Sequence, residues 1–542
     1  MEAAMLPATR QFDEALRIVE VLRAAGFEAF LAGGCVRDLL LGCEPKDYDV
    51  ATSATPDVVL RLFPRTFAVG AHFGVVLVAT CGGANCTCGA ADATCAAEAG
   101  LALPQGAFLG ATNSKRANSE QLAAPQVPQV VTEVATFRSD GAYSDGRHPD
   151  VVRYTSSAEE DVRRRDFTFN GLLLDVDRLF LQEGEAATHP SHKNKNVARA
   201  CPEPAEGGGH PADALSAMGH WQTPEELRSA VIDHVGGLAD LEAGVVRAIG
   251  RPELRFEEDH LRMLRGVRFA ARFGFELEAA TAAAMRSLAA KTRAVSRERV
   301  RDELTKMLTE GRARRAFELL DETGLLAEVL PEAERMKGVE QPPQFHPEGD
   351  VWTHTLLLLG QLDAGCPLTL AWGALLHDVG KPATFRRAER IRFDGHVEVG
   401  VAMGAEICRR FRFSNDETRQ ILSLIENHMR FADAPRMKAS TLKRFFRLEK
   451  FPEHLALHRM DCLAAAGDLE NWRFVRERYE SIPEEAVRPE PLITGRELIA
   501  AGYKPGAGFK EMLRAVEDAQ LEGLITTAGE ALKLVLERFS TV

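Results

Sequence analysis

The sequence contains no run of eighteen consecutive apolar residues, so it predicts no helix that spans a membrane. Residues 1–10 also lack the basic start and the apolar core of a secretory signal peptide. Internal repeats and coiled-coil heptads are missing too, which excludes a solenoid and a long coiled coil. We therefore expect a cytoplasmic protein that has no membrane partner.

The sequence also has no excess of basic residues. The 542 residues include 66 Lys and Arg against 79 Asp and Glu, which gives a formal net charge of −13. This balance excludes a basic protein that coats nucleic acid, and we expect no DNA partner. RNA binding is still compatible with it, because phosphate contacts need only local basic patches. Two such patches are residues 163–165 and the group formed by Arg262, Arg265 and Arg268.

The 10 cysteines do not form the framework of a secreted, disulfide-rich protein. Five of them are scattered among apolar neighbours, as reduced core cysteines usually are: Cys35, Cys43, Cys366, Cys408 and Cys462. Four others lie close together, but their spacing fits no common zinc pattern: Cys81, Cys86, Cys88 and Cys95. We therefore predict no zinc site at this group.

The length predicts two to four domains, because a chain of this size is too long for one hydrophobic core. Residues 11–180 alternate helix and strand signals around a low-complexity insertion at about 81–129. A second low-complexity insertion covers residues 181–230. The chain then reads as helical over 231–335, over 345–470, where histidines gather, and over 485–542. The expected fold is an α/β head with a small mixed β-sheet, followed by all-α domains.

The head begins with a Gly33-Gly34 turn between a strand at residues 29–31 and a helix at residues 35–41. Such a turn lets backbone N–H groups approach a phosphate closely. Asp47 and Asp49 follow on a segment that alternates like a strand, so both carboxylates should point to one face. Two hard oxygen ligands on one face suit Mg²⁺. Taken alone, however, an Asp-x-Asp pair is more often a solvated strand face than a metal site.

The combination of these motifs resembles a known family. The segment with Gly33, Gly34, Asp47 and Asp49 resembles the first motif of class II tRNA nucleotidyltransferases and bacterial poly(A) polymerases. Four further motifs resemble those of the family in the same order: RRRDFTFNGLLLD (163–175), IDHVGGLADL (232–241), EEDHLRMLRGVRFAARFGF (257–275) and SRERVRDEL (296–304). PLITGRELIAAGYKPGAGFKEML (491–513) is similar to the C-terminal segment of many bacterial members.

The resemblance implies a role for each matched residue. Asp47 and Asp49 would be the catalytic carboxylates that hold Mg²⁺, while Arg165 and Asp166 would bind the ribose. Asp259 and Arg262, interpreted as neighbours on one helix face, would read the edge of the incoming base as an acceptor and a forked donor. The other predicted nucleotide-binding residues are Gly33, Gly34, Arg37, Arg265 and Arg268. Glu133 is a weaker candidate for a third carboxylate.

The mechanism that this implies is metal-assisted phosphoryl transfer. Mg²⁺ ions would lower the pKa of the RNA 3′-OH and stabilise the leaving pyrophosphate. The glycine turn and the arginines would neutralise the remaining negative charge. The expected partners are tRNA, ATP and CTP, and the predicted domains are a nucleotidyltransferase head, a helical body that selects nucleotides and a helical RNA-binding tail.

Histidines gather in the helical block 345–470. His377-Asp378 lies in LLHDVGKPAT, and this pattern resembles the HD superfamily of metal-dependent phosphohydrolases, in which His and Asp bind a divalent metal. Imidazole and carboxylate ligands suit a transition metal such as Ni²⁺ or Mn²⁺. The predicted ligands are His354, His377, Asp378, His396 and His428, with Asp461 as a further candidate. The sequence leaves open whether this domain hydrolyses phosphoesters or serves only as an RNA-binding block.

Several functions stay open at this point. The leading expectation is addition of CCA to the 3′ end of tRNA, and the nearest alternatives are addition of the terminal A alone or of a poly(A) tail. Residues 138–152 resemble the flexible loop of A-adding and CCA-adding members, which counts against an enzyme that adds only CC. A different class would be an HD phosphohydrolase with an inactive head, and a third would be a non-catalytic RNA-binding protein. Intact Asp47 and Asp49 argue against both. The choice between CCA and A alone depends on Asp259, Arg262 and the loop around Asp145.

Overall fold

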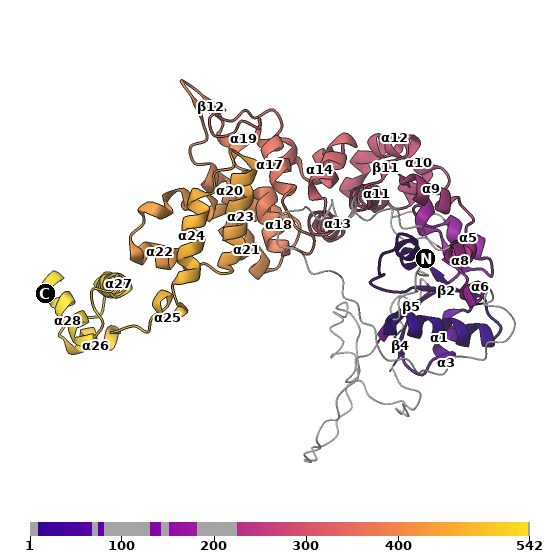
Figure 1. Ribbon diagram of the computed structural model, residues 1–542, viewed down its shortest axis with the longest axis horizontal. Helices are drawn as coiled ribbons and strands as arrows, with labels where there is room; N and C mark the ends of the chain where they lie inside the picture. Colours follow the sequence, from indigo (N-terminus) through magenta and orange to yellow (C-terminus); the bar gives the residue numbers. More distant parts are fainter. Residues whose placement is uncertain (1–8, 68–73, 81–129, 142–150, 181–224, 540–542) are drawn as a thin grey trace, which may run out of the picture. The chain divides into compact units, whose positions relative to one another are not determined.

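The computed structural model describes residues 9–67, 74–80, 130–141, 151–180 and 225–539 (Figure 1). The chain divides into two compact units. Unit 1 consists of Met1–Arg262 with Gly274–Ala284, and unit 2 of Met263–Phe273 with Met285–Val542. The predicted insertion at 81–129, the predicted insertion at 181–230 as far as residue 224, the four neighbouring cysteines and the loop around Asp145 lie outside the described residues. The described part of the chain resumes at residue 225, six residues before the predicted helical region begins at residue 231.

Unit 1 is built on a seven-stranded sheet with the order β3-β4-β5-β2-β1-β8-β9. Its strands are β1 (Ala29–Ala32), β2 (Val50–Thr52), β3 (Thr66–Phe67), β4 (Val75–Thr80), β5 (Val130–Thr136), β8 (Leu173–Leu174) and β9 (Val231–Ile232). The β2–β5 pair is parallel and the other pairs are antiparallel. The predicted mixed sheet is thus confirmed. Strands β4 and β5 stay in register up to the Thr80–Val130 pair, where the chain leaves and re-enters the sheet.

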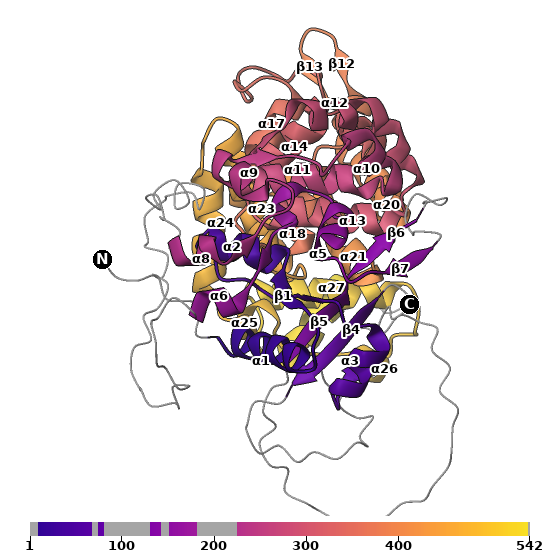
Figure 2. The same ribbon diagram turned by 90° about the vertical axis from the view of Figure 1, so that its right-hand side faces the viewer.

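The helices that cover the sheet follow from short sequence signals. Helix α1 (Arg10–Ala24) starts at Thr9, whose hydroxyl accepts the Phe12 N–H, and it buries one face at helical spacing: Phe12, Ala15, Ile18, Val19 and Leu22. Helix α2 (Gly34–Leu40) follows the glycine turn, and Pro56 begins α3 (Pro56–Leu62). In Figure 2, α1 and α3 lie along strands β4 and β5.

The rest of unit 1 consists of short elements. They are the hairpin β6 (Arg138–Asp140) and β7 (Val152–Tyr154), α5 (Ala158–Arg163), the 3-10 helix η2 (Thr168–Asn170), α6 (Val176–Phe180), α8 (Glu225–Ser229), α9 (Gly237–Ala243), β10 (Val245–Val246), α10 (Pro252–Glu258) and β11 (Glu276–Leu277). Helices α11 (Leu261–Phe273) and α12 (Ala279–Leu288) are divided between the two units.

The structure corrects the prediction that Asp259 and Arg262 are neighbours on one helix face. Helix α10 ends at Glu258 and α11 begins at Leu261, because Asp259 adopts an extended conformation (φ −145°, ψ 106°). Its carboxylate accepts the Leu261 N–H at 3.1 Å, as a helix-capping aspartate does. Asp259 and Arg262 are therefore not neighbours on one uninterrupted helix.

Unit 2 is helical, as predicted. Its first helices are η3 (Ala289–Ala294), α13 (Arg297–Thr309), α14 (Ala313–Glu322), α15 (Leu325–Val329) and α16 (Pro331–Glu334). The histidine-bearing part follows with α17 (Val351–Leu359), α18 (Leu368–Leu376), α19 (Lys381–Thr384), a small hairpin of β12 (Arg386–Arg387) and β13 (Ile391–Arg392), α20 (His396–Arg410), α21 (Asn415–Asn427), η4 (His428–Arg436), α22 (Ala439–Phe446) and α23 (Phe451–Ala464). The chain ends with α24 (Glu470–Ser481), α25 (Glu484–Val487), α26 (Gly495–Ala500), α27 (Gly508–Leu521) and α28 (Ala528–Arg538).

Helix α18 organises the histidine-bearing part. Its sequence LTLAWGALL is apolar on all sides, and the residues from Thr369 to Leu376 are all buried. A helix of this kind is stable only when other elements surround it, and here α13, α17, α21 and α23 pack against it. Burial of α18 carries the next two residues, His377 and Asp378, into the interior.

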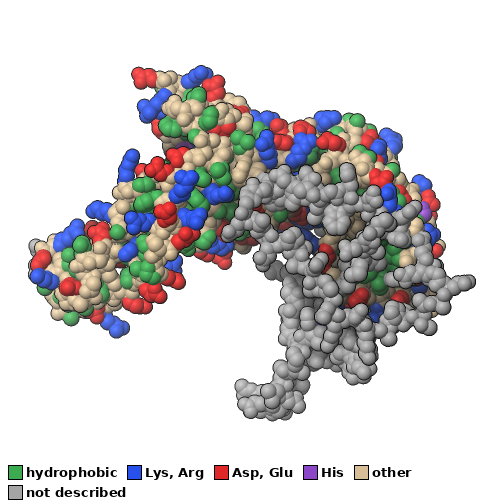
Figure 3. Space-filling view, in the orientation of Figure 1, with side chains coloured by type: hydrophobic (Ala, Val, Ile, Leu, Met, Phe, Trp, Pro, Cys, Tyr) green, Lys and Arg blue, Asp and Glu red, His purple; other side chains and the backbone are tan. Residues whose placement is uncertain are grey.

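The surface of unit 2 carries charges of both signs. On the face that Figure 3 shows, Lys and Arg side chains are interspersed with Asp and Glu. None of the helices that the structure describes is long and apolar enough to cross a membrane.

Gly380 lies where two backbone segments of unit 2 come close together. A Cβ atom at Gly380 would lie 2.1 Å from the His396 carbonyl oxygen and 2.6 Å from the Gly400 nitrogen. Because both are backbone atoms, α20 could not keep its position beside a larger residue.

We predict that Gly380→Ala lowers the free energy of unfolding of unit 2 by about 3 kcal/mol, the upper part of the range for overpacking a tight contact. Thermal unfolding followed by circular dichroism measures this. Gly529→Ala is the matched control, because a Cβ there meets nothing within 4 Å. Equal unfolding temperatures for Gly380→Ala and the parent protein would contradict the prediction.

Candidate active sites

Three carboxylates come together at one end of the β2–β5 pair. Val50 pairs with Val134 in parallel register, so the residues one step earlier, Asp49 and Glu133, lie side by side on the same face of the sheet. Asp49 is half-buried. Removal of water and the nearby charges of Glu133 and Asp47 raise the pKa of Asp49 to about 7. Desolvation and the Asp47 carboxylate likewise raise the pKa of Glu133.

The strand that follows Asp49 is shorter than predicted and does not include this residue. Strand β2 begins at Val50, and Asp47 lies in the loop before it. The Asp49 carbonyl still accepts the Ala32 N–H at 3.0 Å, but the chain turns at Gly33 immediately afterwards. No backbone of β1 therefore remains to pair with residue 47. The two aspartates approach each other through this loop rather than through the alternation of a strand.

The predicted glycine turn lies against Arg165. Gly33 has φ +73°, a conformation that favours glycine, and its N–H donates to the Leu172 carbonyl at 3.0 Å. A Cβ atom at Gly33 would lie only 3.0 Å from Nη1 of Arg165. The guanidinium of Arg165 also acts against the rise of the Asp49 pKa, so its positive charge is felt at the carboxylates. The turn, Arg165 and the carboxylates thus form one site.

Hydrogen bonds hold Arg165 and Asp166 in place. Arg165 donates to the Asn170 carbonyl at 3.2 Å and forms an ion pair with Asp161 at 3.0 Å. Burial opposes the ionisation of Asp161, but the guanidinium groups of Arg165 and Arg164 lower the pKa of this carboxylate. Asp166 accepts hydrogen bonds from the Phe167 N–H at 2.8 Å and the Asn170 side chain at 3.1 Å.

Asn170 connects this segment to α2 and was not singled out from the sequence. Its amide oxygen accepts a hydrogen bond from Arg37 at 2.7 Å. Arg37 is buried and also donates to Asp38 through Nε and Nη2 at 2.8 and 2.7 Å. This placement suits a residue that positions the glycine turn better than one that touches a nucleotide.

Arg262 lies beside the segment that carries Arg165. Its guanidinium donates to the Arg164 carbonyl at 3.2 Å and to the Arg255 carbonyl at 3.0 Å, and it forms an ion pair with Glu258. Cations are favoured at the carbonyl end of a helix, and α5 ends at Arg163. The structure therefore brings the segment of Asp259 and Arg262 to the predicted ribose-binding residues.

The two remaining predicted arginines belong to unit 2. Arg268 is buried, donates to Glu303 at 2.7 Å and to Glu310 at 3.2 Å, and stacks over Phe269 at 4.3 Å. Arg265 is half-buried, with its guanidinium 5.8 Å from the Phe269 ring. Arg268 thus ties α11 to α13 and to the residue that follows it.

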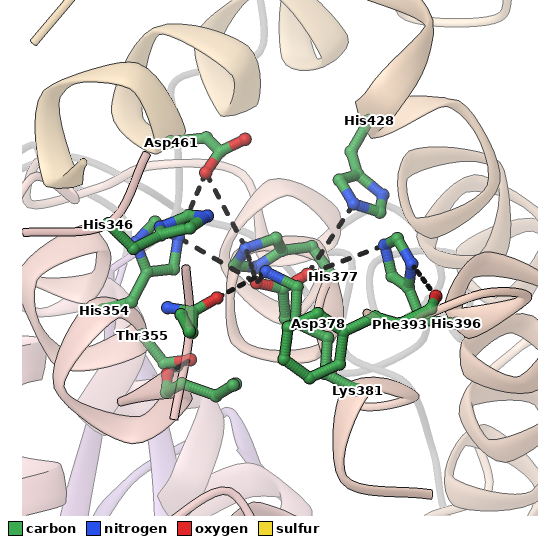
Figure 4. Close-up of polar contacts among 12 residues, drawn as sticks. His346, His354, Thr355, His377, Asp378, Lys381, Phe393, His396, His428 and Asp461 are labelled. Carbon is green, nitrogen blue, oxygen red and sulfur yellow. Dashed lines mark hydrogen bonds and ion pairs between the residues drawn. The ribbon is translucent and has the colours of Figure 1, made fainter. Parts of the chain in front are cut away.

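A second site lies in the interior of unit 2. Figure 4 shows its side chains converging, and they come from α17, α20, η4, α23 and the residues directly after α18. All five predicted ligands and the further candidate meet there: His354, His377, Asp378, His396, His428 and Asp461. The Nε2 atom of His377 lies 3.2 Å from Oδ2 of Asp378, and that of His354 lies 3.0 Å from Oδ1 of Asp461.

Each imidazole is oriented by its other nitrogen. The Nδ1–H groups of His377, His396 and His428 donate to backbone carbonyls at 2.8, 3.0 and 2.7 Å. Nδ1 of His354 bonds to Glu348 at 2.7 Å. The Nε2 atoms consequently point inward, where those of His377, His396 and His428 are buried and have no hydrogen-bond partner among the described residues. Buried lone pairs of this kind, fixed by second-layer hydrogen bonds, fit metal ligands.

The charge states at this site also suit a cation. Burial lowers the pKa of His428 to about 4, so its ring is neutral at pH 7. Burial opposes the ionisation of Asp378, but His377 and Lys381 hold the pKa of this carboxylate well below its usual range. Burial also opposes the charge of His354, but Asp461 and Glu348 raise its pKa to about 9. The neutral ring of His428 and the ionised carboxylates suit a divalent metal, and a metal bound at His354 would displace the proton of that ring.

Two second-layer residues were not recognised in the sequence. Glu348 accepts hydrogen bonds from both His346 (2.8 Å) and His354 (2.7 Å). His346 and Glu348 both belong to the stretch QPPQFHPEGD (341–350), directly before α17. A pocket of about 680 Å³ opens beside the cluster, and its lining includes Phe345, Arg387, Arg390, Phe393 and Met429.

Comparisons with known proteins agree with this arrangement. The model of the poly(A) polymerase head domain matches residues 29–86 and 107–184, and that of the probable RNA- and SrmB-binding site of polymerase A matches residues 274–337. The HD domain model matches residues 351–466. The carboxylate site and the histidine cluster therefore lie in segments that match two different families of domains.

Individual proteins are similar over much of the chain. The CCA-adding enzyme of Latilactobacillus sakei is 30% identical over 65% of this chain and 66% of its own length. That of Streptococcus thermophilus is 26% identical over the full length of both. The structure of the Bacillus stearothermophilus CCA-adding enzyme in complex with CTP covers 98% of each chain at 23% identity with a TM-score of 0.60, which indicates the same fold.

The raised pKa of Asp49 predicts a stability effect with a definite sign. The folded pKa lies above that of an unfolded aspartate, so ionisation of Asp49 destabilises the metal-free fold increasingly as pH rises from about 4 to about 7. Asp49→Asn should therefore stabilise the protein more at pH 8 than at pH 5, by on the order of 2 kcal/mol after allowance for solvent screening.

Urea unfolding in EDTA at the two pH values measures this difference. Glu20→Gln, an exposed substitution in the middle of α1, is the control and should show no such dependence. A stabilisation by Asp49→Asn that is the same at pH 5 and pH 8 would refute the raised pKa of Asp49.

Proposed function

Because the chain belongs to the family of class II tRNA nucleotidyltransferases and bacterial poly(A) polymerases that carry an HD domain, we propose that it adds C and A nucleotides to the 3′ end of tRNA. CTP and ATP are the donors and pyrophosphate is released. The observation that carries the proposal is the group of three carboxylates beside Arg165 and the Gly33-Gly34 turn. The proposed site of action is the cytoplasm, where tRNA is processed.

Asp47, Asp49 and Glu133 are the proposed ligands of the catalytic metal. The three carboxylates repel one another, burial and this repulsion raise the pKa values of Asp49 and Glu133, and a divalent cation relieves the repulsion. Mg²⁺ suits them because it binds hard oxygen ligands and completes its shell with water and phosphate oxygens. When bound, Mg²⁺ neutralises developing charge on the phosphates and makes the RNA 3′-OH more acidic.

The chain's own side chains bind and orient the nucleotide. The Gly33-Gly34 turn lets the backbone approach the phosphates, and Arg165 beside it supplies positive charge. Asp166, held by Asn170, accepts a hydrogen bond from the ribose. Asp259 and Arg262 offer an acceptor and a donor to the base edge in place of a template.

The proposal includes both C and A because relatives that match over nearly the whole chain are named CCA-adding enzymes. Addition of the terminal A alone and addition of a poly(A) tail are the alternatives. A tRNA substrate separates all three, since each activity uses a different combination of RNA end and nucleotide.

We predict that the protein with Mg²⁺ incorporates CTP into tRNA that ends at the discriminator base or at the first C, and ATP into tRNA that ends in CC. Gel analysis of labelled tRNA, with one nucleotide supplied at a time, measures this. Asp47→Ala and Asp49→Ala should each lower incorporation by a factor of a thousand or more, in keeping with loss of a metal ligand (on the order of 4 kcal/mol).

Asp57→Ala, an exposed carboxylate on α3 outside the cluster, is the matched control and should retain full activity. Use of ATP on the CC-ended tRNA without any use of CTP would make the protein an A-adding enzyme. Undiminished incorporation by Asp47→Ala and Asp49→Ala would overturn the assignment of the metal ligands.

We also propose a second activity, hydrolysis of phosphoesters at the histidine cluster. The oriented and buried Nε2 atoms support it, because a site without a function would not be expected to keep so many polar atoms unsatisfied. Ni²⁺ or Mn²⁺ fits the mixture of imidazole and carboxylate ligands. When bound, such a metal activates water for attack on phosphorus.

Hydrolysis of p-nitrophenyl phosphate or a nucleoside monophosphate should depend on added Ni²⁺ or Mn²⁺. His377→Ala should lower the rate at least a hundredfold, while Asp47→Ala should leave it unchanged. Release of phosphate that persists in EDTA, or that is the same for His377→Ala, would show that the cluster is not a hydrolytic site.

A further inference from the structure

The β12–β13 hairpin carries four exposed arginines within seven residues, at positions 386, 387, 390 and 392. Its two strands pair so that Arg386 lies directly opposite Arg392. Side chains at directly opposed positions leave the same face of a hairpin, and like charges there destabilise the pairing. Figure 1 shows the hairpin projecting beyond the neighbouring helix α19. It therefore presents to the outside two positive charges that repel each other.

Acidic side chains compensate only part of this charge. Arg387 forms an ion pair with Glu340 at 3.2 Å. Within the described part of the chain, the side chains of the other three arginines have no ion pair or hydrogen bond. Positive charges outnumber negative ones two to one over residues 386–394. The face that carries Arg386 and Arg392 thus lacks an anion that would relieve their repulsion.

Exposed apolar side chains lie beside the arginines. Phe345 is 62% exposed and Met429 is 50% exposed, and both line the pocket of about 680 Å³ together with residues 387–394. Phe385, directly before β12, is also exposed, and its ring lies 6.0 Å from that of Phe393. Phe345 and Phe385 are the only phenylalanines that the structure describes as exposed. Apolar groups gathered in this way on a polar surface mark a contact with a partner.

The same pocket adjoins the histidine cluster. Phe393 lines the pocket, and its carbonyl accepts a hydrogen bond from Nδ1 of His396 at 3.0 Å, a contact that Figure 4 shows. Met429 lines the pocket as well and directly follows His428 in the sequence. A ligand that lies along the hairpin therefore has one end beside the cluster.

Single-stranded RNA has the chemistry that this surface requires. Its phosphates match the arginines, and its unstacked bases offer flat faces to aromatic rings and guanidinium planes. A duplex hides those faces between its base pairs. An acidic peptide matches the positive charge but offers no base to the ring of Phe345. The combination of arginines with exposed rings thus favours a single strand over either of them.

We propose that the hairpin surface, formed by β12, β13, Phe345 and Met429, binds single-stranded RNA. A phosphate lies against Arg386 and Arg392 and relieves their repulsion, while a base stacks on Phe345. The end of the strand then enters the histidine cluster. This last step rests on the proposed hydrolytic function and names its substrate as an RNA end. The docking of the strand itself does not depend on that function.

Photochemical cross-linking of the full-length chain tests the proposal. The probe is an oligouridylate of about eight nucleotides that contains 4-thiouridine, a length within the range that one single-strand site covers. EDTA is present and nucleotides are omitted, so that neither hydrolysis nor elongation alters the probe. Mass spectrometry of the digested protein should place cross-links in residues 342–346 and 385–393. A parent protein without cross-links in these two segments would overturn the proposal.

Variants separate the contribution of charge from that of stacking. A triple change, Arg386→Ala, Arg390→Ala and Arg392→Ala, should lower the yield of these cross-links at least tenfold. The matched control removes three exposed arginines of other helices, Arg409→Ala, Arg419→Ala and Arg476→Ala, and should keep the yield of the parent. Phe345→Ala should weaken binding about tenfold, as loss of one stacked base does, while Phe345→Tyr should bind like the parent. Equal yields for the triple variant and its control would contradict the proposal.

The dependence of the cross-links on salt gives an independent measurement. The logarithm of the affinity, plotted against the logarithm of the KCl concentration, should have a slope shallower by about 2 in the triple variant, because each phosphate contact with a single strand contributes about 0.7. Phe345→Ala should leave the slope unchanged. Hexaglutamate that competes as well as unlabelled oligouridylate would assign the surface to an acidic peptide and overturn the proposal. Failure of the protein to hydrolyse p-nitrophenyl phosphate would refute the hydrolytic function alone, so the two failures are distinguishable.

Discussion

The parallel pairing of β2 with β5 is the constraint on which the carboxylate site depends. Like charges do not gather spontaneously, and burial together with the charges of Glu133 and Asp47 raises the pKa of Asp49. The backbone hydrogen bonds of the sheet fix Val50 beside Val134 regardless of that repulsion, and the residues one step earlier are held together as a consequence. The scaffold thus keeps the site strained in the absence of a cation and ready to receive one.

The histidine cluster is organised by burial instead of strand register. Helix α18 has no polar face, so it is buried among its neighbours and brings His377 and Asp378 into a space with little water. The backbone carbonyls of Ala374, Phe393 and Ile425 then select the orientation of three imidazoles. In this part of the chain the apolar packing comes first and the polar geometry follows from it.

The sequence predicted the features that depend on local motifs and missed those that depend on contacts between segments far apart in the chain. Asp47, Asp49 and the histidine ligands stood in recognisable local motifs, and the order of α/β and all-α regions followed from periodicity. Glu133 remained a weak candidate because its relation to Asp49 depends on a strand pairing across a long insertion. Asn170 and Glu348 act only through contacts made in the folded chain. The break at Asp259 was missed because a capping aspartate interrupts an otherwise continuous amphipathic pattern.

The Thr80–Val130 pair has a consequence for how this fold tolerates variation. The chain leaves the sheet and returns to it at directly opposed residues, so the sheet is closed at that point whatever length of polypeptide lies between. The entropy lost in closing such a loop grows only with the logarithm of its length, about 0.6 kcal/mol for each doubling. Long additions can therefore accumulate here at small thermodynamic expense while Glu133, only three residues beyond the junction, keeps its place beside Asp49.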